Sequence, residues 1–219
     1  MALVLMLLDH IHYIFDFTGI VPIWFSWLGR ISGWLFLFTV VEGFVRTSNR
    51  KKYFLRIWLM GAAMGIVNIL LSLFLRRGDG FSPIANIMGM FTLLMVLWQG
   101  IGWIKQRNLR SIAKGICVLV LPFALYFCFS KLPMSIMPYA YMLEQVFIPL
   151  PFLTEGGLPF LLGGLVLYIF HKHRKLQVAI WAMVVLGWNL YIGMAMSIPF
   201  GSQWLMLHYE WMVVFAAIP

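Results

Sequence analysis

The stretch from Trp24 to Val45, WFSWLGRISGWLFLFTVVEGFV, decides the fold class of this chain. It is apolar almost throughout, and its only charged residues are Arg30 and Glu42. About 20 predominantly apolar residues are needed for one helix to cross the hydrocarbon core of a bilayer, so this stretch predicts a transmembrane helix. Further continuous runs of this kind follow along the chain, which favours a helical bundle over the alternating ten-residue segments of a transmembrane barrel.

The overall composition excludes a water-soluble domain. Of the 219 residues, 63% are hydrophobic and 11% are charged, and the mean hydropathy is +0.92. Too little polar surface remains to cover a soluble fold of this size. The sequence therefore predicts an all-α, polytopic transmembrane helix bundle. No stretch is long and polar enough for a separate soluble domain, so we expect one membrane domain over residues 1–219, and we expect the complete protein to extend beyond both ends.

About eight spans and one irregular segment are predicted. The spans cover Ala2–Phe17, Trp24–Val45, Phe54–Leu75, Pro83–Ile104, Gly115–Phe129, Leu158–Phe170, Leu176–Ile198 and Gln203–Pro219. Between Lys131 and Gly157, closely spaced prolines interrupt an apolar, aromatic-rich stretch. Because proline removes a backbone donor and breaks the helical ladder, this stretch is interpreted as a re-entrant or interfacial segment and not as a span.

The basic residues indicate how the chain is oriented. Most Lys and Arg residues follow the second, fourth and sixth predicted spans, whereas the alternate connections hold only Arg76, Arg77 and Lys131. By the positive-inside rule, both termini are expected in the cytoplasm of a bacterial cytoplasmic membrane. These short clusters also account for the net charge of +9, so the expected partners are membrane lipids and no nucleic acid is expected. The N-terminus lacks a basic region and a small-residue cleavage site, which argues against a removable signal peptide.

Ionisable residues within the apolar runs are the candidate functional residues. Asp9, His10 and His12 lie in the first span, and Arg30 and Glu42 lie in the second. Placing a charge near the bilayer centre costs several kcal/mol, so such residues commonly have a function. Histidine is suited to accept a proton near neutral pH, with Asp9 or Arg30 to orient it. The alternative is that an Asp9–Arg30 ion pair only holds two helices together.

Other polar residues have a structural interpretation that is at least as plausible. Glu42 lies beside Arg46 in sequence, as expected for a surface ion pair. Asn86, in the fourth span, is typical of interhelical hydrogen bonding. Cys117 and Cys128 fall about three turns apart on one predicted helix, which is too far for a disulfide. No metal site is predicted, because no group of residues has suitable ligand spacing.

An ordered set of motifs resembles the TraX family, membrane acyltransferases named for the enzyme that acetylates the N-terminus of conjugative F-type pilin. The resemblance rests on motifs within about the first 95 residues. In order, these are Leu7-Leu8-Asp9-His10-Ile11; Leu28-Gly29-Arg30; Val41-Glu42-Gly43-Phe44; the residues Thr47, Asn49, Arg50, Lys51, Lys52, Tyr53 and Arg56; Asn86-Ile87-Met88; and Phe91-Thr92. His12 is not part of the family pattern, so only His10 inherits the catalytic expectation.

The resemblance implies transfer of an acetyl group from cytoplasmic acetyl-CoA to a peptide, glycan or lipid acceptor at the membrane. His10 is then the proton acceptor, with Asp9 and Arg30 as its catalytic partners. The residues expected to contact the cofactor are Glu42, Arg50, Lys51, Lys52, Arg56 and Asn86, with Asn86 as a candidate donor to the oxyanion. The basic residues among them have an alternative role in ordinary positive-inside topology.

The residues alone are also compatible with two functions of other classes. A proton-coupled transporter or flippase could use Asp9, His10, Arg30 and Glu42 as a relay, although such folds usually contain paired broken helices and only one Pro-rich interruption is seen. A non-catalytic assembly factor would use the same residues to hold the bundle together.

Overall fold

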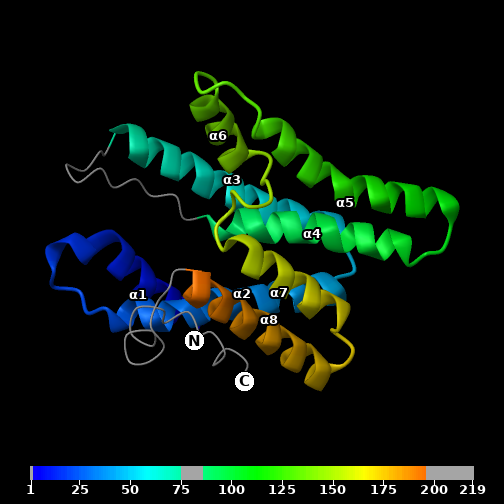
Figure 1. The fold of residues 1–219 in the computed structure, drawn as a ribbon, viewed down its shortest axis with the longest axis horizontal. Helices are drawn as coiled ribbons and strands as arrows, with labels where there is room; N and C mark the ends of the chain where they lie inside the picture. Colours follow the sequence, from blue (N-terminus) through cyan, green and yellow to red (C-terminus); the bar gives the residue numbers. More distant parts are fainter. Residues whose placement is uncertain (1, 75–85, 196–219) are drawn as a thin grey trace. The chain divides into compact units, whose positions relative to one another are not determined.

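A computed structural model describes residues 2–74 and 86–195, and within these ranges the chain is all-α, as predicted (Figure 1). The helices are α1 (Ala2–Phe15), α2 (Trp24–Arg46), α3 (Arg50–Phe74), α4 (Ile87–Ile104), α5 (Leu109–Phe129), α6 (Met137–Val146), α7 (Gly157–Ile169) and α8 (Arg174–Ala195), with one 3₁₀ turn, η1 (Asp16–Thr18), after α1.

The helix lengths confirm an integral membrane protein. Five of the described helices, α2, α3, α4, α5 and α8, are long and apolar enough to cross a bilayer, and α7 is a shorter apolar helix. The Pro-rich segment contributes only α6, whose 10 residues reach about 15 Å and cannot span the hydrocarbon core. The predicted last span, Gln203–Pro219, lies outside the described residues, as do Arg76 and Arg77.

Two helices begin four or more residues earlier than the hydropathy pattern predicts. α3 begins at Arg50 and not at Phe54, and α5 begins at Leu109 and not at Gly115. In each case an asparagine accepts a hydrogen bond at the helix start: Asn49 from the Lys52 N–H at 3.0 Å and Asn108 from the Arg110 N–H at 3.2 Å. Such caps satisfy backbone donors that the helix leaves unpaired. Five of the basic residues that precede the predicted spans are therefore on helical turns: Arg50, Lys51, Lys52, Arg110 and Lys114.

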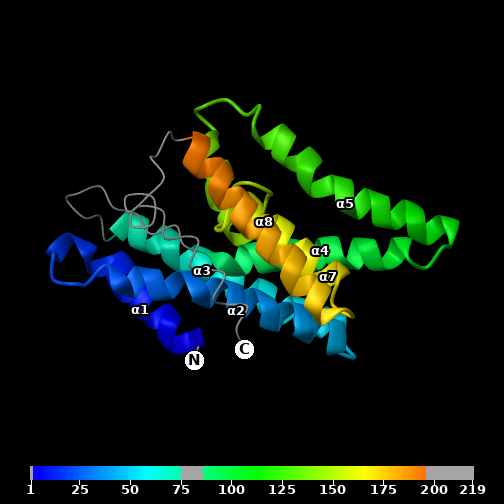
Figure 2. The same cartoon turned by 60° about the horizontal axis from the view of Figure 1, so that its bottom comes forward.

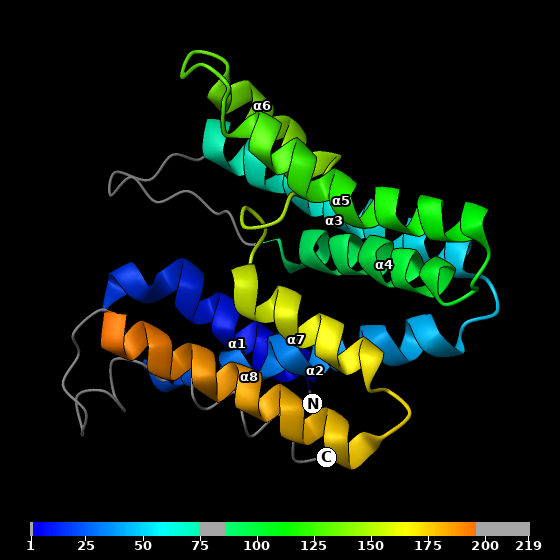
Figure 3. The same cartoon turned by 45° about the vertical axis from the view of Figure 1, so that its right-hand side comes forward.

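The described residues divide into two compact units, which are treated separately. The first unit comprises the chain up to residue 45 and from residue 162, and the second comprises residues 46–161. In the first unit, α2 packs on α7 and α8, which Figure 3 shows running beside it. The Trp34 ring of α2 contacts the Trp181 ring of α8 edge-on at 5.3 Å, and Gly163 of α7 leaves the space that the Trp34 ring fills.

The second unit is built on close helix approaches at glycine. Gly61 of α3 faces Met88 and Gly89 of α4, and Gly65 of α3 faces the α6 backbone at Gln145 and Val146. Gly61 and Gly65 are four residues apart, a spacing of small residues that lets membrane helices approach closely. Figures 1 and 2 both show α5 lying along α4. The α4 side chains from Met90 to Met95 are fully or almost fully buried, so α4 forms the core of this unit.

Candidate functional site

Asp9 of α1 is the centre of a polar cluster between α1 and α2. The Asp9 side chain occupies the space above Gly29, where any Cβ atom would overlap with it. Ser26, which is buried, donates a hydrogen bond to the Asp9 carboxylate, and Arg30, His10 and His12 interact with it electrostatically. The structure thus brings together Asp9, His10 and Arg30, the three residues that the sequence nominates for catalysis.

His10 is held in one ring orientation by its own helix. Its Nδ1 atom lies 2.9 Å from the backbone oxygen of Met6, one turn earlier, and the side chain is partly buried. A carbonyl oxygen can only accept, so Nδ1 carries the hydrogen in this bond. In the neutral ring, Nε2 is therefore the basic nitrogen. A histidine in this tautomer can act as a general base through Nε2.

His12 has a different partner. Its Nε2 atom lies 3.4 Å from Oδ1 of Asp16, one turn later in η1, and the Asp16 side chain is largely exposed. The pair lies at the end of α1, where a carboxylate on one turn meets an imidazole on the previous one. The second histidine of the cluster thus has an acidic partner of its own.

Glu42 takes part in an ion pair with a partner that the sequence did not suggest. Its Oε1 atom lies 3.3 Å from Nη1 of Arg174 on α8. The Arg174 guanidinium also lies over the Phe38 ring, 4.5 Å from its centroid, and donates to the buried Gln177 at 2.8 Å. Sequence proximity pointed to Arg46, and the tertiary structure adds a cation from α8, more than 100 residues later in the chain. This ion pair links α2 to α8 within the first unit.

The basic residues expected to contact the cofactor all lie near the start of α3. Arg50, Lys51, Lys52 and Arg56 are exposed on its first two turns. Exposed cations on a helical turn can reach phosphate groups in solution. They belong to the second unit, as does Asn86, whereas Asp9, His10, Arg30 and Glu42 belong to the first.

Asn86 precedes α4 and is buried, with 8% of its surface exposed. Its amide nitrogen donates to the backbone oxygens of Gly61 at 3.0 Å and Gln145 at 3.2 Å. Both amide hydrogens are therefore engaged, which is not the arrangement that an oxyanion donor needs. Asn86 instead joins α3, α4 and α6, the interhelical role that the sequence offered as its alternative.

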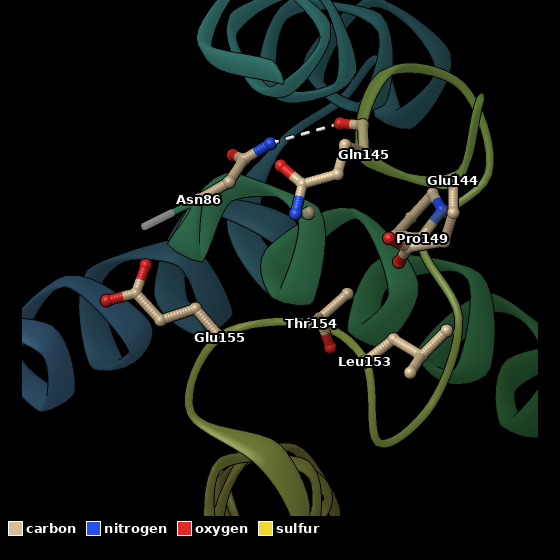
Figure 4. A pocket seen from close by; sticks show the side chains of 8 residues that line it. Asn86, Glu144, Gln145, Pro149, Leu153, Thr154 and Glu155 are labelled. Carbon is tan, nitrogen blue, oxygen red and sulfur yellow. Dashed lines mark hydrogen bonds between the residues drawn. The ribbon is translucent and has the colours of Figure 1, made fainter. Parts of the chain in front are cut away.

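Asn86 also lines a small pocket of about 20 Å³ in the second unit (Figure 4). The other lining residues are Gly89, Glu144, Gln145, Pro149, Leu153, Thr154 and Glu155. Glu144 is 5% exposed, and its Oε1 atom accepts a hydrogen bond from the Leu150 N–H at 3.1 Å. Burial raises the pKa of Glu144 to about 7, and the bond from Leu150 opposes this shift.

The family model of the TraX protein matches residues 1–210 of this chain. This chain belongs to the TraX family. Comparisons with the curated proteins and with the solved structures find no match. The TraX match includes described residues of both units and extends well beyond the first 95 residues, on which the motif resemblance rests.

Sequence reasoning missed two residues of this TraX chain that the structure places in polar clusters. Ser26 could not be recognised from the sequence, because serine is common in membrane helices. Only the packing of α1 on α2 gives Ser26 a hydrogen-bond partner in Asp9. Glu144 could have been recognised from the sequence, because it is a carboxylate in an apolar stretch, like Asp9. The rule that drew attention to Asp9 applies equally to Glu144.

Proposed function

We propose that this chain is an integral membrane acyltransferase that transfers an acetyl group from cytoplasmic acetyl-CoA to an amine or hydroxyl acceptor at the membrane. Its membership of the TraX family supports this proposal. The single structural observation that carries it is the hydrogen bond from His10 to the Met6 carbonyl, which leaves Nε2 of His10 as the basic nitrogen next to an anchored carboxylate.

His10 acts as the general base in the proposed reaction. As the acceptor nitrogen or oxygen attacks the thioester carbonyl, Nε2 of His10 takes the proton that this atom loses. The new bond to the acetyl carbon forms, the carbon–sulfur bond breaks, and the departing thiolate takes the proton back from the imidazolium. Atoms and charges balance, and the ring returns to its neutral form without any further reactant.

Asp9 and Arg30 support this step without exchanging protons. A carboxylate near the ring stabilises the positive charge that His10 gains during the reaction. Ser26 fixes the carboxylate by its hydrogen bond, and Gly29 lets it approach α2. Arg30 balances the charge of Asp9 between turnovers, so the cluster does not bury an unpaired anion.

Acetyl-CoA carries phosphate groups, which the exposed cations at the start of α3 can bind. Arg50, Lys51, Lys52 and Arg56 provide the positive charge and N–H donors for this contact. Under the positive-inside orientation these residues face the cytoplasm, where acetyl-CoA is available. The proposal gives Asn86 no donor role, because both of its amide hydrogens are engaged. The acceptor is a peptide N-terminus, a glycan or a lipid headgroup.

Acetyl transfer can be tested with membranes that contain the full-length protein and acetyl-CoA labelled in the acetyl group. The unmodified protein should transfer label from the thioester to a membrane acceptor, and His10→Gln should abolish this transfer. His173→Gln is the matched control, because His173 is an exposed histidine on the loop between α7 and α8 and should retain activity. If the unmodified protein consumes no thioester above background, the proposal is wrong.

A further inference from the structure

The pocket beside Asn86 has a chemical character that the proposed acetyl transfer does not use. Two short segments and one loop build it: Asn86 and Gly89 at the start of α4, Glu144 and Gln145 at the end of α6, and the loop from Pro149 to Glu155. In Figure 4 the Glu144 and Glu155 side chains lie on opposite sides of this pocket. All the lining residues belong to the second unit, so the pocket does not depend on the placement of the first.

Hydrogen-bond donors in this pocket are largely engaged already. Both amide hydrogens of Asn86 go to the carbonyl oxygens of Gly61 and Gln145. The amide nitrogen of Gln145 donates to the Tyr141 hydroxyl at 2.9 Å. The Thr154 hydroxyl points its hydrogen at the Met90 sulfur, 3.9 Å away. What these side chains still offer a ligand is mainly oxygen acceptors.

Hydrogen-bond acceptors, in contrast, are left over. The Asn86 amide oxygen is buried and has no hydrogen-bond partner in the described part of the chain. Glu144 uses Oε1 for the Leu150 N–H, which leaves the lone pairs of its second oxygen for another donor. A buried acceptor without a partner is unfavourable, so a ligand that donates hydrogen bonds in this pocket would offset that cost.

The charge of the pocket also selects its ligand. Of the lining residues within the described ranges, Glu144 and Glu155 are acidic and none is basic, although the chain has 16 Lys and Arg residues against 7 Asp and Glu. An acidic pocket in so basic a chain disfavours anions such as phosphates and attracts cations. A primary ammonium group is a cation with three donors and no acceptor, which matches what the pocket lacks.

We propose that the pocket lined by Asn86, Glu144, Gln145 and Thr154 binds a small primary amine in its protonated form. The ammonium group pairs with the Glu144 carboxylate and donates its other hydrogens to the neutral oxygens of the pocket. Pro149 and Leu153 contact the short aliphatic part of the amine. This inference concerns binding only and goes beyond acetyl transfer, since it uses no residue of the His10 cluster.

Equilibrium binding of n-propylamine to the purified full-length protein in phosphatidylcholine nanodiscs tests this inference at pH 8. Propylamine should bind saturably, whereas 1-propanol (neutral), propionate (an anion) and tetramethylammonium (a cation without N–H donors) should bind at least tenfold more weakly. Equal binding of propylamine and propanol, or preferential binding of propionate, would overturn the proposal.

Substitution of the carboxyl group identifies the site. Glu144→Gln keeps the oxygen that accepts from Leu150 but removes the charge, and should weaken propylamine binding at least tenfold. Asp16→Asn, which removes an exposed carboxylate in the other unit, should leave binding unchanged. Full-strength binding in Glu144→Gln would refute the assignment.

The unmodified protein provides an independent readout if Glu144→Gln does not fold. Among the described residues, the titratable groups near Glu144 are Glu155 in the pocket wall and Tyr141 on α6, while α3 and the start of α4 contribute the uncharged Gly61, Gly65, Asn86 and Gly89. A carboxyl that titrates near pH 7 should bind propylamine about tenfold more tightly at pH 8 than at pH 6. Affinity that does not rise with pH would contradict the proposal.

Lipid composition distinguishes two sources of the ammonium group. Phosphatidylethanolamine carries a primary ammonium and phosphatidylcholine does not. If nanodiscs of phosphatidylethanolamine lower the apparent propylamine affinity, the pocket takes the lipid headgroup. If they do not, it takes a soluble amine.

Discussion

Gly29 on α2 leaves the space that the Asp9 side chain of α1 occupies. The two residues are far apart in sequence, and their contact sets how closely α1 approaches α2. It also places the Asp9 carboxylate within reach of Ser26 and Arg30. Gly29 thus has a specific structural role, since it accommodates an ionisable side chain inside an apolar bundle.

Replacing Gly29 by alanine should displace Asp9. The added methyl group overlaps with the Asp9 side chain, and overpacking of this kind costs about 1–3 kcal/mol. We expect a lower thermal unfolding temperature and a loss of acetyl transfer. Gly187→Ala on α8 is the matched control, because a Cβ there meets nothing within 4 Å. It should leave the protein as stable as before or slightly more so. Equal effects of the two substitutions would show that the Asp9 contact is unimportant.

Replacing Ser26 by alanine should remove the donor that holds Asp9. A buried carboxylate that loses one hydrogen bond is destabilised by about 1–3 kcal/mol. We expect kcat for acetyl transfer to fall about tenfold or more while KM for acetyl-CoA changes little, because Ser26 positions a group that acts in the chemical step. Ser26→Thr keeps the hydroxyl and should restore part of the rate. An unchanged kcat in Ser26→Ala would rule out this positioning role.

Removing the cations of Lys51 and Lys52 together should raise KM for acetyl-CoA about threefold to tenfold and leave kcat nearly unchanged. The reason is that exposed phosphate contacts contribute to binding and are screened by salt. The effect should therefore shrink at high ionic strength. Lys172→Ala with Lys175→Ala removes the same charge from another exposed basic cluster, and KM should stay unchanged. A fall in kcat without a change in KM would point to a role other than cofactor binding.

The Glu42–Arg174 ion pair should contribute little to stability. Half of the Arg174 side chain is exposed, and the atoms are 3.3 Å apart, so the coupling energy should be at most about 1 kcal/mol. A double-mutant cycle with Glu42→Gln and Arg174→Gln measures it directly. A coupling energy of several kcal/mol would show that the pair is far better shielded from water than its exposure indicates.

Stability should depend on pH through Glu144. Burial raises the pKa of Glu144 from 4.5 to about 7, so between these values the folded protein keeps a proton that the unfolded chain releases. The free energy of unfolding should therefore fall by on the order of 3 kcal/mol as the pH rises from about 4.5 to about 7, and level off above. Thermal unfolding of the protein in detergent, compared with that of Glu144→Gln, measures this slope. The same slope in both proteins would assign it to other groups.

The five long apolar helices α2, α3, α4, α5 and α8 could be located from the sequence because each must be apolar over about 20 residues, and this local property does not depend on neighbours. Asp9, His10 and Arg30 could be selected for the same reason, since a charge in an apolar run stands out without any knowledge of packing. The starts of α3 and α5 could not, because Asn49 and Asn108 extend the helices into basic segments that hydropathy assigns to loops.

Only the tertiary structure decided which polar groups meet. Arg174 pairs with Glu42, Ser26 with Asp9, and Asn86 with Gly61 and Gln145, across separations that no local pattern encodes. Hydropathy fixes where a helix lies along the chain because it sums over many residues. A hydrogen bond depends on a few tenths of an ångström between two atoms, and only the packing of helix on helix determines that distance.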